Sequence, residues 1–191
     1  LMPLGFETNY RPIVVEFTSA PSSGGLLTAE FSNLDPGNSG LPLFDFSASP
    51  LVQINKASRN GFWKLNNSGI VGGVFTISVT GTGFFGVSNL NELRVIRRAP
   101  SGAWTAPGTA INGTGSTSAP ICSRSGQSQF GEFTIGGDST SNSLPLSWIS
   151  FSGKLKEDIV NLNWKTSGEF NCSHFDIERS KHFGEFEVKG K

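Results

Sequence analysis

Short runs in which every second residue is apolar recur along this chain of 191 residues, and turn-forming residues separate them. In residues 11–20 this period places Ile13, Val15 and Phe17 on one face of an extended strand, and residues 25–31 repeat it. Glycine and proline, which the interior of a sheet tolerates poorly, fall between the runs. The pattern predicts antiparallel β-structure with many turns.

Further runs of the same kind continue through the first two thirds of the chain. They occupy residues 51–57, 61–66, 74–80, 93–99 and 129–135. About seven short strands suit two sheets packed face to face, so the sequence predicts an all-β protein that begins with a β-sandwich. Residues 33–50 contain several glycines and prolines and are predicted as a long loop. The best helical candidate, residues 88–98, has no convincing capping residue, so very little helix is expected.

A change in composition divides the chain. We expect a β-sandwich domain over residues 1–137, a Ser/Pro linker over 138–147 and a second β-region over 148–191. In the last region, apolar residues fall into two strand patterns joined by a charged turn, and two shorter runs follow. Three or four strands cannot close a sandwich, because their apolar face needs an opposing sheet. We therefore expect an incomplete second sandwich, which a neighbouring domain or another protomer would cover.

Charge and hydropathy exclude several kinds of partner. The fifteen acidic and fifteen basic residues cancel, so no overall field attracts nucleic acid or an anionic membrane surface. No apolar run approaches the roughly 18 residues of a membrane-spanning helix. Arg94, Arg97 and Arg98 are interpreted as a solvated strand face.

Cys122 and Cys172 lie in different predicted regions, and free buried thiols are the simpler interpretation, with a single bridge as the alternative.

The sequence gives little support for catalysis. The chain has two histidines, His174 and His182, both in the second region, and it has no G-x-S-x-G nucleophile motif. Residues 81–86 read G-x-G-x-x-G, but a dinucleotide site also needs those glycines to open a helix within a βαβ unit. The cysteines and histidines lack the paired spacing of a zinc site. We expect no enzymatic activity and no bound cofactor.

Calcium is the one ion for which candidate ligands can be named. Asp35, Asn38 and Asp45 lie in or beside a glycine-rich segment and could present oxygen atoms to Ca²⁺. The same residue types form Asx turns, which is the other interpretation.

Exposed aromatic side chains could bind carbohydrate by stacking on sugar rings. Trp63, Trp104 and Tyr10 are the candidates, together with the pair Phe84–Phe85. Packing in the core or against a neighbouring domain is the alternative for each.

Two resemblances bear on these expectations. Residues 148–179 resemble the first half of a fibronectin type III domain, with residues 162–164 as its second strand and 175–178 as its third. Nearly the whole chain resembles a region near the carboxy end of large secreted proteins of Bacteroidota. The phrases that carry this second resemblance are NYRP (9–12), SGLPL (39–43), GFW (61–63), FTIGG (133–137), LPLSWISFSGK (144–154), LNWKT (162–166) and FDIERS (175–180).

The resemblance implies an immunoglobulin-like or fibronectin type III-like β-sandwich, followed by an incomplete second one, in a protein exported by the type IX route. It also implies O-glycosylation at Asp138-Ser139-Thr140, with Ser139 and Thr140 as acceptors. The expected function is that of a non-catalytic extracellular module, a spacer, adhesin segment or surface-assembly subunit. The alternative is a carbohydrate-binding module of a larger polysaccharide-processing protein, with glycans as partners.

Overall fold

The computed structural model describes the chain apart from residues 143–146, 157–158, 168–174, 181–185 and 191. The chain forms two compact units, Leu1–Leu144 and Pro145–Lys191, which are described separately below. Every regular element in the described ranges is a β-strand, except for one turn of 3₁₀-helix, η1 (Leu90–Glu92). The all-β prediction is therefore confirmed. None of the helical structure in this part of the chain has the length and apolar character needed to cross a membrane.

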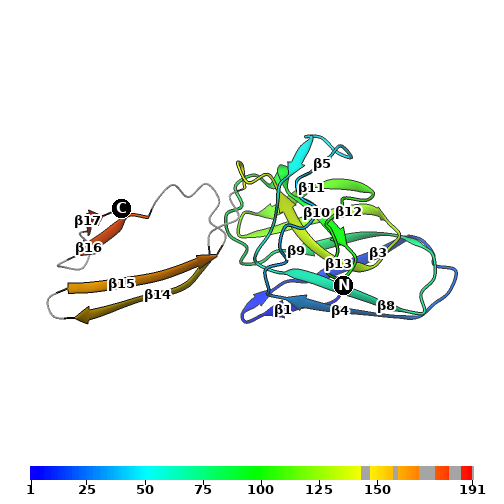
Figure 1. The fold of residues 1–191 in the computed structure, drawn as a ribbon. Helices are drawn as coiled ribbons and strands as arrows, with labels where there is room; N and C mark the ends of the chain where they lie inside the picture. Colours follow the sequence, from blue (N-terminus) through cyan, green and yellow to red (C-terminus); the bar gives the residue numbers. More distant parts are fainter. Residues whose placement is uncertain (143–146, 157–158, 168–174, 181–185, 191) are drawn as a thin grey trace. The chain divides into compact units, whose positions relative to one another are not determined.

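Unit 1 contains two large antiparallel sheets (Figure 1). The first has the order β10-β13-β8-β4, and β7 also pairs with β13. Its strands are β4 (Leu26–Ser32), β7 (Lys56–Ala57), β8 (Phe62–Ser68), β10 (Arg94–Arg98) and β13 (Gly131–Gly137). The second has the order β11-β12-β9-β3. Its strands are β3 (Ile13–Ser19), β9 (Val74–Thr80), β11 (Thr109–Ser116) and β12 (Ala119–Gln127).

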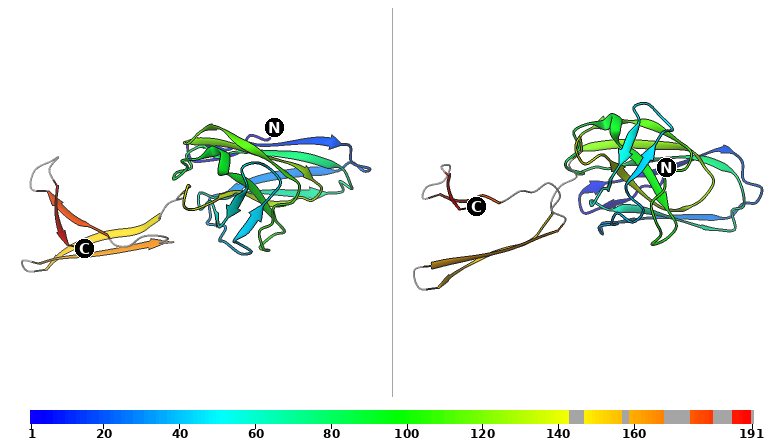
Figure 2. Two further views of the ribbon diagram at one scale, coloured as in Figure 1. Left: turned by 90° about the horizontal axis from the view of Figure 1, so that it is seen from above. Right: turned by 45° about the horizontal axis from the view of Figure 1, so that its top comes forward.

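Two small hairpins complete unit 1. One is formed by β1 (Gly5–Phe6) and β2 (Asn9–Tyr10), and the other by β5 (Leu43–Asp45) and β6 (Val52–Ile54). Residues 33–50, predicted as a loop, therefore contain one short strand. The views of Figure 2 allow both hairpins to be followed relative to the two large sheets.

One hydrophobic core draws residues from both large sheets. Its fully buried members include Trp63, Leu65, Val95, Phe133 and Ile135 from the first sheet and Ile13, Phe75, Ile77, Val79 and Cys122 from the second. On β3 and β4 the apolar residues of the predicted period-two pattern all pack against this core. Removing each such large side chain from water contributes about 1.5–3 kcal/mol, so the alternation itself determines which face of each strand turns inward.

A second, smaller core lies against the first sheet. Val52, Ile54, Ala57, Ile96 and Trp104 are buried together. On β10, Val95 belongs to the main core, whereas the next residue, Ile96, belongs to this second one. Both faces of β10 are therefore covered, and Arg94 and Arg98, which share a face with Ile96, are enclosed with it.

The strands predicted for unit 1 are present, and the structure adds the short strands β1, β2 and β5. The sequence pattern did not indicate β11 and β12, which contribute half of the second sheet. The helical candidate at residues 88–98 becomes η1 followed by β10. Asn89 caps η1, because its side chain accepts a hydrogen bond from Asn91 N at 3.1 Å and donates one to Glu92 Oε1 at 2.7 Å.

Residues 138–142, expected as the start of a linker, pack on unit 1. Asn142 is fully buried, and its Oδ1 accepts hydrogen bonds from the backbone N–H groups of Ser88 and Asn89, each at 3.0 Å. Its own backbone N–H donates to Asp138 O at 2.7 Å. These residues therefore belong to the first unit.

Unit 2 consists of two hairpins in the part that the structure describes. One pairs β14 (Ser147–Lys156) with β15 (Ile159–Ser167), and the other pairs β16 (Ile177–Ser180) with β17 (Phe186–Gly190). Each of the four runs predicted for this region overlaps a strand within the described residues. The side chain of Trp148 lies outside the described part.

Candidate functional site

The two tryptophans proposed as sugar-binding platforms are enclosed in unit 1. Trp63 is 0% and Trp104 is 2% exposed. Each indole N–H has a backbone acceptor at 2.9 Å, Arg11 O for Trp63 and Gly37 O for Trp104. Since neither ring presents a face to solvent, both are structural residues. Tyr10, by contrast, is 50% exposed on β2.

The arginines of β10 do not form a solvated face, because Arg94 and Arg98 are buried. The Arg98 guanidinium carbon lies 4.2 Å from the centre of the Trp104 ring and 5.6 Å from that of Phe62. Its Nε donates to Glu132 Oε2 at 2.6 Å. The segments that cover the outer face of β10 come from distant parts of the sequence, so local periodicity could not reveal this burial.

Each of the three proposed calcium ligands has partners within the protein. Asn38 Oδ1 accepts from Ala57 N at 2.9 Å, and Asp35 forms an Asx turn with Gly37 N at 2.8 Å. Asp45 is buried and paired with arginines. Within the described ranges no three His, Cys, Asp or Glu side chains gather as a metal site. These oxygens are therefore used in turns and ion pairs.

Asp45 and two arginines form a buried charge cluster. Arg124 donates to Asp45 Oδ2, and Arg94 Nε lies 3.6 Å from the same oxygen. Burial pushes the pKa of Asp45 upward, but hydrogen bonds from Ser47 and the charge of Arg124 outweigh it and hold the pKa below its ordinary value. Arg124 Nε also donates to Val95 O at 2.6 Å. A side chain from the second sheet thus binds the edge strand of the first.

The expected glycosylation acceptors differ in accessibility. Ser139 is buried, and its backbone N–H donates to Asn55 Oδ1 at 2.8 Å. Thr140 is exposed, and its hydroxyl donates to Asp138 Oδ1 at 2.9 Å. Backbone and side-chain hydrogen bonds from Thr140 help to lower the pKa of Asp138. Of the two hydroxyls, only that of Thr140 is open to solvent.

Cys122 is a buried free thiol in the main core. Burial raises its pKa to about 12, so it is neutral at physiological pH and chemically inert. Cys172, His174 and His182 lie outside the described residues.

The G-x-G-x-x-G segment is a loop after β9, and its Phe84 packs on Trp63 with ring centres 5.9 Å apart. That loop has a structural role in closing the core.

One face of the β14–β15 hairpin in unit 2 carries several exposed apolar side chains. The register places Phe151 opposite Trp164 and Leu155 opposite Val160. These four side chains lie on one face because they alternate with polar residues. The other face carries Ile159 near the turn and is otherwise polar, with Ser150, Ser152, Lys154, Lys156, Asn161, Asn163 and Lys165. Phe151 is 64%, Leu155 73% and Val160 59% exposed.

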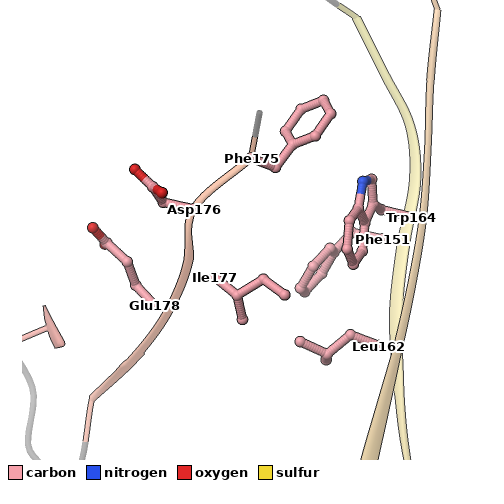
Figure 3. Close-up of a pocket in the computed structure, with 7 residues that line it drawn as sticks. All are labelled: Phe151, Leu162, Trp164, Phe175, Asp176, Ile177 and Glu178. Carbon is pink, nitrogen blue, oxygen red and sulfur yellow. The ribbon is translucent and has the colours of Figure 1, made fainter. Parts of the chain in front are cut away.

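Part of this face is covered within unit 2. A cavity of about 250 Å³ lies between the hairpin and the segment that leads into β16. Figure 3 shows Phe175 and Ile177 directed toward the hairpin, while the carboxylates of Asp176 and Glu178 are directed away from it. The rings of Phe175 and Trp164 meet edge to face at 6.1 Å. Phe175 and Ile177 therefore face the hairpin, and the acidic residues between and after them face away from it.

Comparison with known proteins identifies no relative. No protein-family model matches the chain, and neither the curated proteins nor the solved structures include a match.

Proposed function

We propose that this chain is a non-catalytic structural and interaction module of an extracellular bacterial protein. Unit 1 is the folded building block, and unit 2 supplies an apolar β-surface that packs on another sheet, from a neighbouring domain or a second protomer. The secreted location and the immunoglobulin-like or fibronectin type III-like type of the sandwich rest on the sequence resemblance. The all-β architecture with antiparallel sheets supports a sandwich of this general class.

The apolar face of the β14–β15 hairpin is the observation that carries this proposal. An exposed Phe, Leu and Val on one face of a two-stranded hairpin is unfavourable in water, and isolated hairpins are marginally stable at best. Phe175 and Ile177 cover only the part of the face near Trp164. Leu155 and Val160, toward the other end of the hairpin, remain open to a partner.

Contacts within unit 1 satisfy its buried charged groups, as expected of a folded building block. Its buried charged side chains are held by internal partners, as in the pairs of Arg98 with Glu132 and of Arg124 with Asp45. Such pairs fix the position of loops and sheet edges. The saccharide-binding alternative cannot use Trp63 or Trp104, because both indoles are enclosed.

Sedimentation velocity over a range of protein concentrations tests the proposal. In a purified sample the only available sheet is that of another copy, so we expect the chain to associate as its concentration rises. The double variant Leu155→Lys/Val160→Lys should remain monomeric. The matched control is Ser152→Lys/Asn161→Lys, which adds the same charges to the opposite face of the same hairpin and should associate like the wild type. A monomeric wild type at all concentrations, or equal loss of association in both variants, would contradict the proposal.

A further inference from the structure

A concavity at one end of unit 1 has a different character from the apolar face of unit 2. It has a volume of about 350 Å³, which is in the lower part of the range of small-molecule sites. Its walls come from the β1–β2 hairpin, the turn before β8 and the loop after β9, which lie far apart in the sequence. Residues from several segments therefore converge on one hollow.

Two solvent-exposed phenylalanine rings flank this concavity. Phe85 is 64% and Phe6 is 38% exposed. The neighbouring Phe84 is 2% exposed and fills the core, so the same short loop places one ring inside and one outside. An exposed aromatic ring beside a hollow provides a flat apolar surface on which the C–H face of a sugar can stack.

Amide side chains provide the polar part of the lining. Asn9, Asn33 and Asn60 all line the concavity. Asn60 Nδ2 donates to Ser58 Oγ at 3.2 Å, whereas the side-chain amides of Asn9 and Asn33 have no hydrogen-bond partner among the described residues. An amide offers both donors and an acceptor, which is the combination that a sugar hydroxyl pairs with.

One glycine determines where the Asn9 amide lies. Gly83 has a φ of +74°, and a Cβ added there would lie 2.5 Å from Asn9 Oδ1. The positive φ favours glycine at this position. The loop after β9 therefore passes close to the Asn9 amide of the β1–β2 hairpin.

The charged groups of the lining favour a neutral ligand. Arg11 is 5% exposed, and its guanidinium donates to Thr82 O at 2.8 Å and to Asn60 O at 3.1 Å. Arg59 Nε lies 3.4 Å from Asp35 Oδ2, so its charge is balanced. Glu7 also lines the concavity and would repel an anion. The positive charges are therefore engaged within the protein.

We propose that this concavity binds a neutral saccharide, of about one or two pyranose rings, between Phe6 and Phe85. The adjoining depression, lined by Tyr10 and sharing Glu7 and Asn9 with the first, would accept a further ring of a longer chain. This assigns a ligand class to unit 1 and is independent of the packing proposed for unit 2.

Titration of the ¹⁵N-labelled chain, followed by amide spectra, tests the site. The probes are neutral oligosaccharides of glucose, galactose, mannose, xylose or N-acetylglucosamine, and oligogalacturonate as the anionic counterpart. We expect at least one neutral probe to shift the amides of residues 6–9, 60 and 83–85, and oligogalacturonate to bind more weakly. No binding across the neutral panel, shifts confined to other residues, or preferred binding of oligogalacturonate would overturn the proposal.

Two pairs of variants make the test specific. Phe85→Ala should weaken binding at least about tenfold, whereas Phe46→Ala, which removes an equally exposed ring that does not line the concavity, should leave it unchanged. Asn33→Ala should weaken binding, and Asn112→Ala, an exposed asparagine on β11, should not. All four positions are exposed, so the variants should keep the wild-type melting temperature. Equal effects within either pair would count against the site.

Discussion

Asp45 joins segments of unit 1 that are remote in sequence, because its carboxylate accepts from Ser47 and Arg124 and lies close to Arg94. Asp45→Asn leaves two buried guanidinium groups without their counter-charge. Loss of one partner from a buried ion pair costs about 3–5 kcal/mol, so we expect the free energy of unfolding to fall by that amount in urea at pH 7. Asp35→Asn is the matched control, since its ion pair with Arg59 is solvent-exposed on the carboxylate side and worth no more than about 1 kcal/mol.

The same residue makes the stability depend on acidity. The pKa of Asp45 is lower in the folded chain than in the unfolded chain, so its contribution is present above the unfolded value of 3.8 and is lost as the pH falls through the folded pKa. The stability difference between the wild type and Asp45→Asn should therefore shrink as the pH is lowered below about 4. Urea unfolding at pH 7 and pH 3 measures it; a constant difference would show that Asp45 is not ionised in the fold.

Cys122 should make the free energy of unfolding fall as the pH rises in the alkaline range. Its thiol ionises near 9.0 when unfolded and at about 12 in the fold, so its ionisation favours the unfolded state between these values. In a Cys172→Ser background, the free energy of unfolding should fall by up to about 1.4 kcal/mol per pH unit above pH 9. A variant that also carries Cys122→Ala should not show this loss. The native thiol should also fail to react with a disulfide reagent at pH 8. Rapid reaction without unfolding would contradict its burial.

At the scale of elements, several hydrogen bonds hold the segment after β13 on unit 1, and the fully buried side chain of Asn142 accepts two of them. Asn142→Ala removes the acceptor for the N–H groups of Ser88 and Asn89. Two partly buried donors then lack a partner, which should cost about 1 kcal/mol and speed thermolysin cleavage within residues 138–142. Thr140→Ala alters an exposed residue of the same segment and should change the unfolding free energy by less than about 1 kcal/mol. Cleavage at equal rates in both variants would show that Asn142 does not hold the segment.

The sequence predicts a strand well where its buried positions are apolar. β3 and β9 illustrate this, since their inward residues are Ile, Val and Phe. β12 alternates as far as Arg124, where its register shifts, but its buried positions are Pro120, Cys122, Arg124 and Gln127, so no hydrophobic period marks it. Arg124 is stable there only because Asp45, 79 residues away, neutralises it. Such pairing depends on the finished fold, and no local pattern reveals it.

The two candidate surfaces also differ in how well the sequence predicts them, because one depends on local sequence and the other on contacts in the folded chain. The apolar face of unit 2 depends on a single hairpin, and the period of Phe151, Leu155 and Val160 indicates it directly. The concavity of unit 1 combines segments near residues 6, 33, 60 and 85, which only the folded chain brings together. Single aromatic residues were poor guides, because Trp104 is enclosed by a loop that the sequence did not place over it.

On the scale of the whole molecule, unit 1 contains both hydrophobic cores. A fragment of residues 1–144 should therefore fold alone, with a thermal transition that coincides with the main transition of the full chain in calorimetry. A fragment of residues 1–137 lacks Asn142 and Asp138 and should melt at a lower temperature. Failure of the longer fragment to fold, or identical melting of the two, would contradict this division of the chain.

The two unlike faces of the β14–β15 hairpin limit what it can build. Lys154, Lys156 and Lys165 occupy the polar face, so a second layer can be added from one side only, and charged side chains along strands resist growth at the edges. Once one partner sheet is seated, no equivalent surface remains for a third. Assembly through this hairpin would accordingly end in closed pairs instead of growing into fibres.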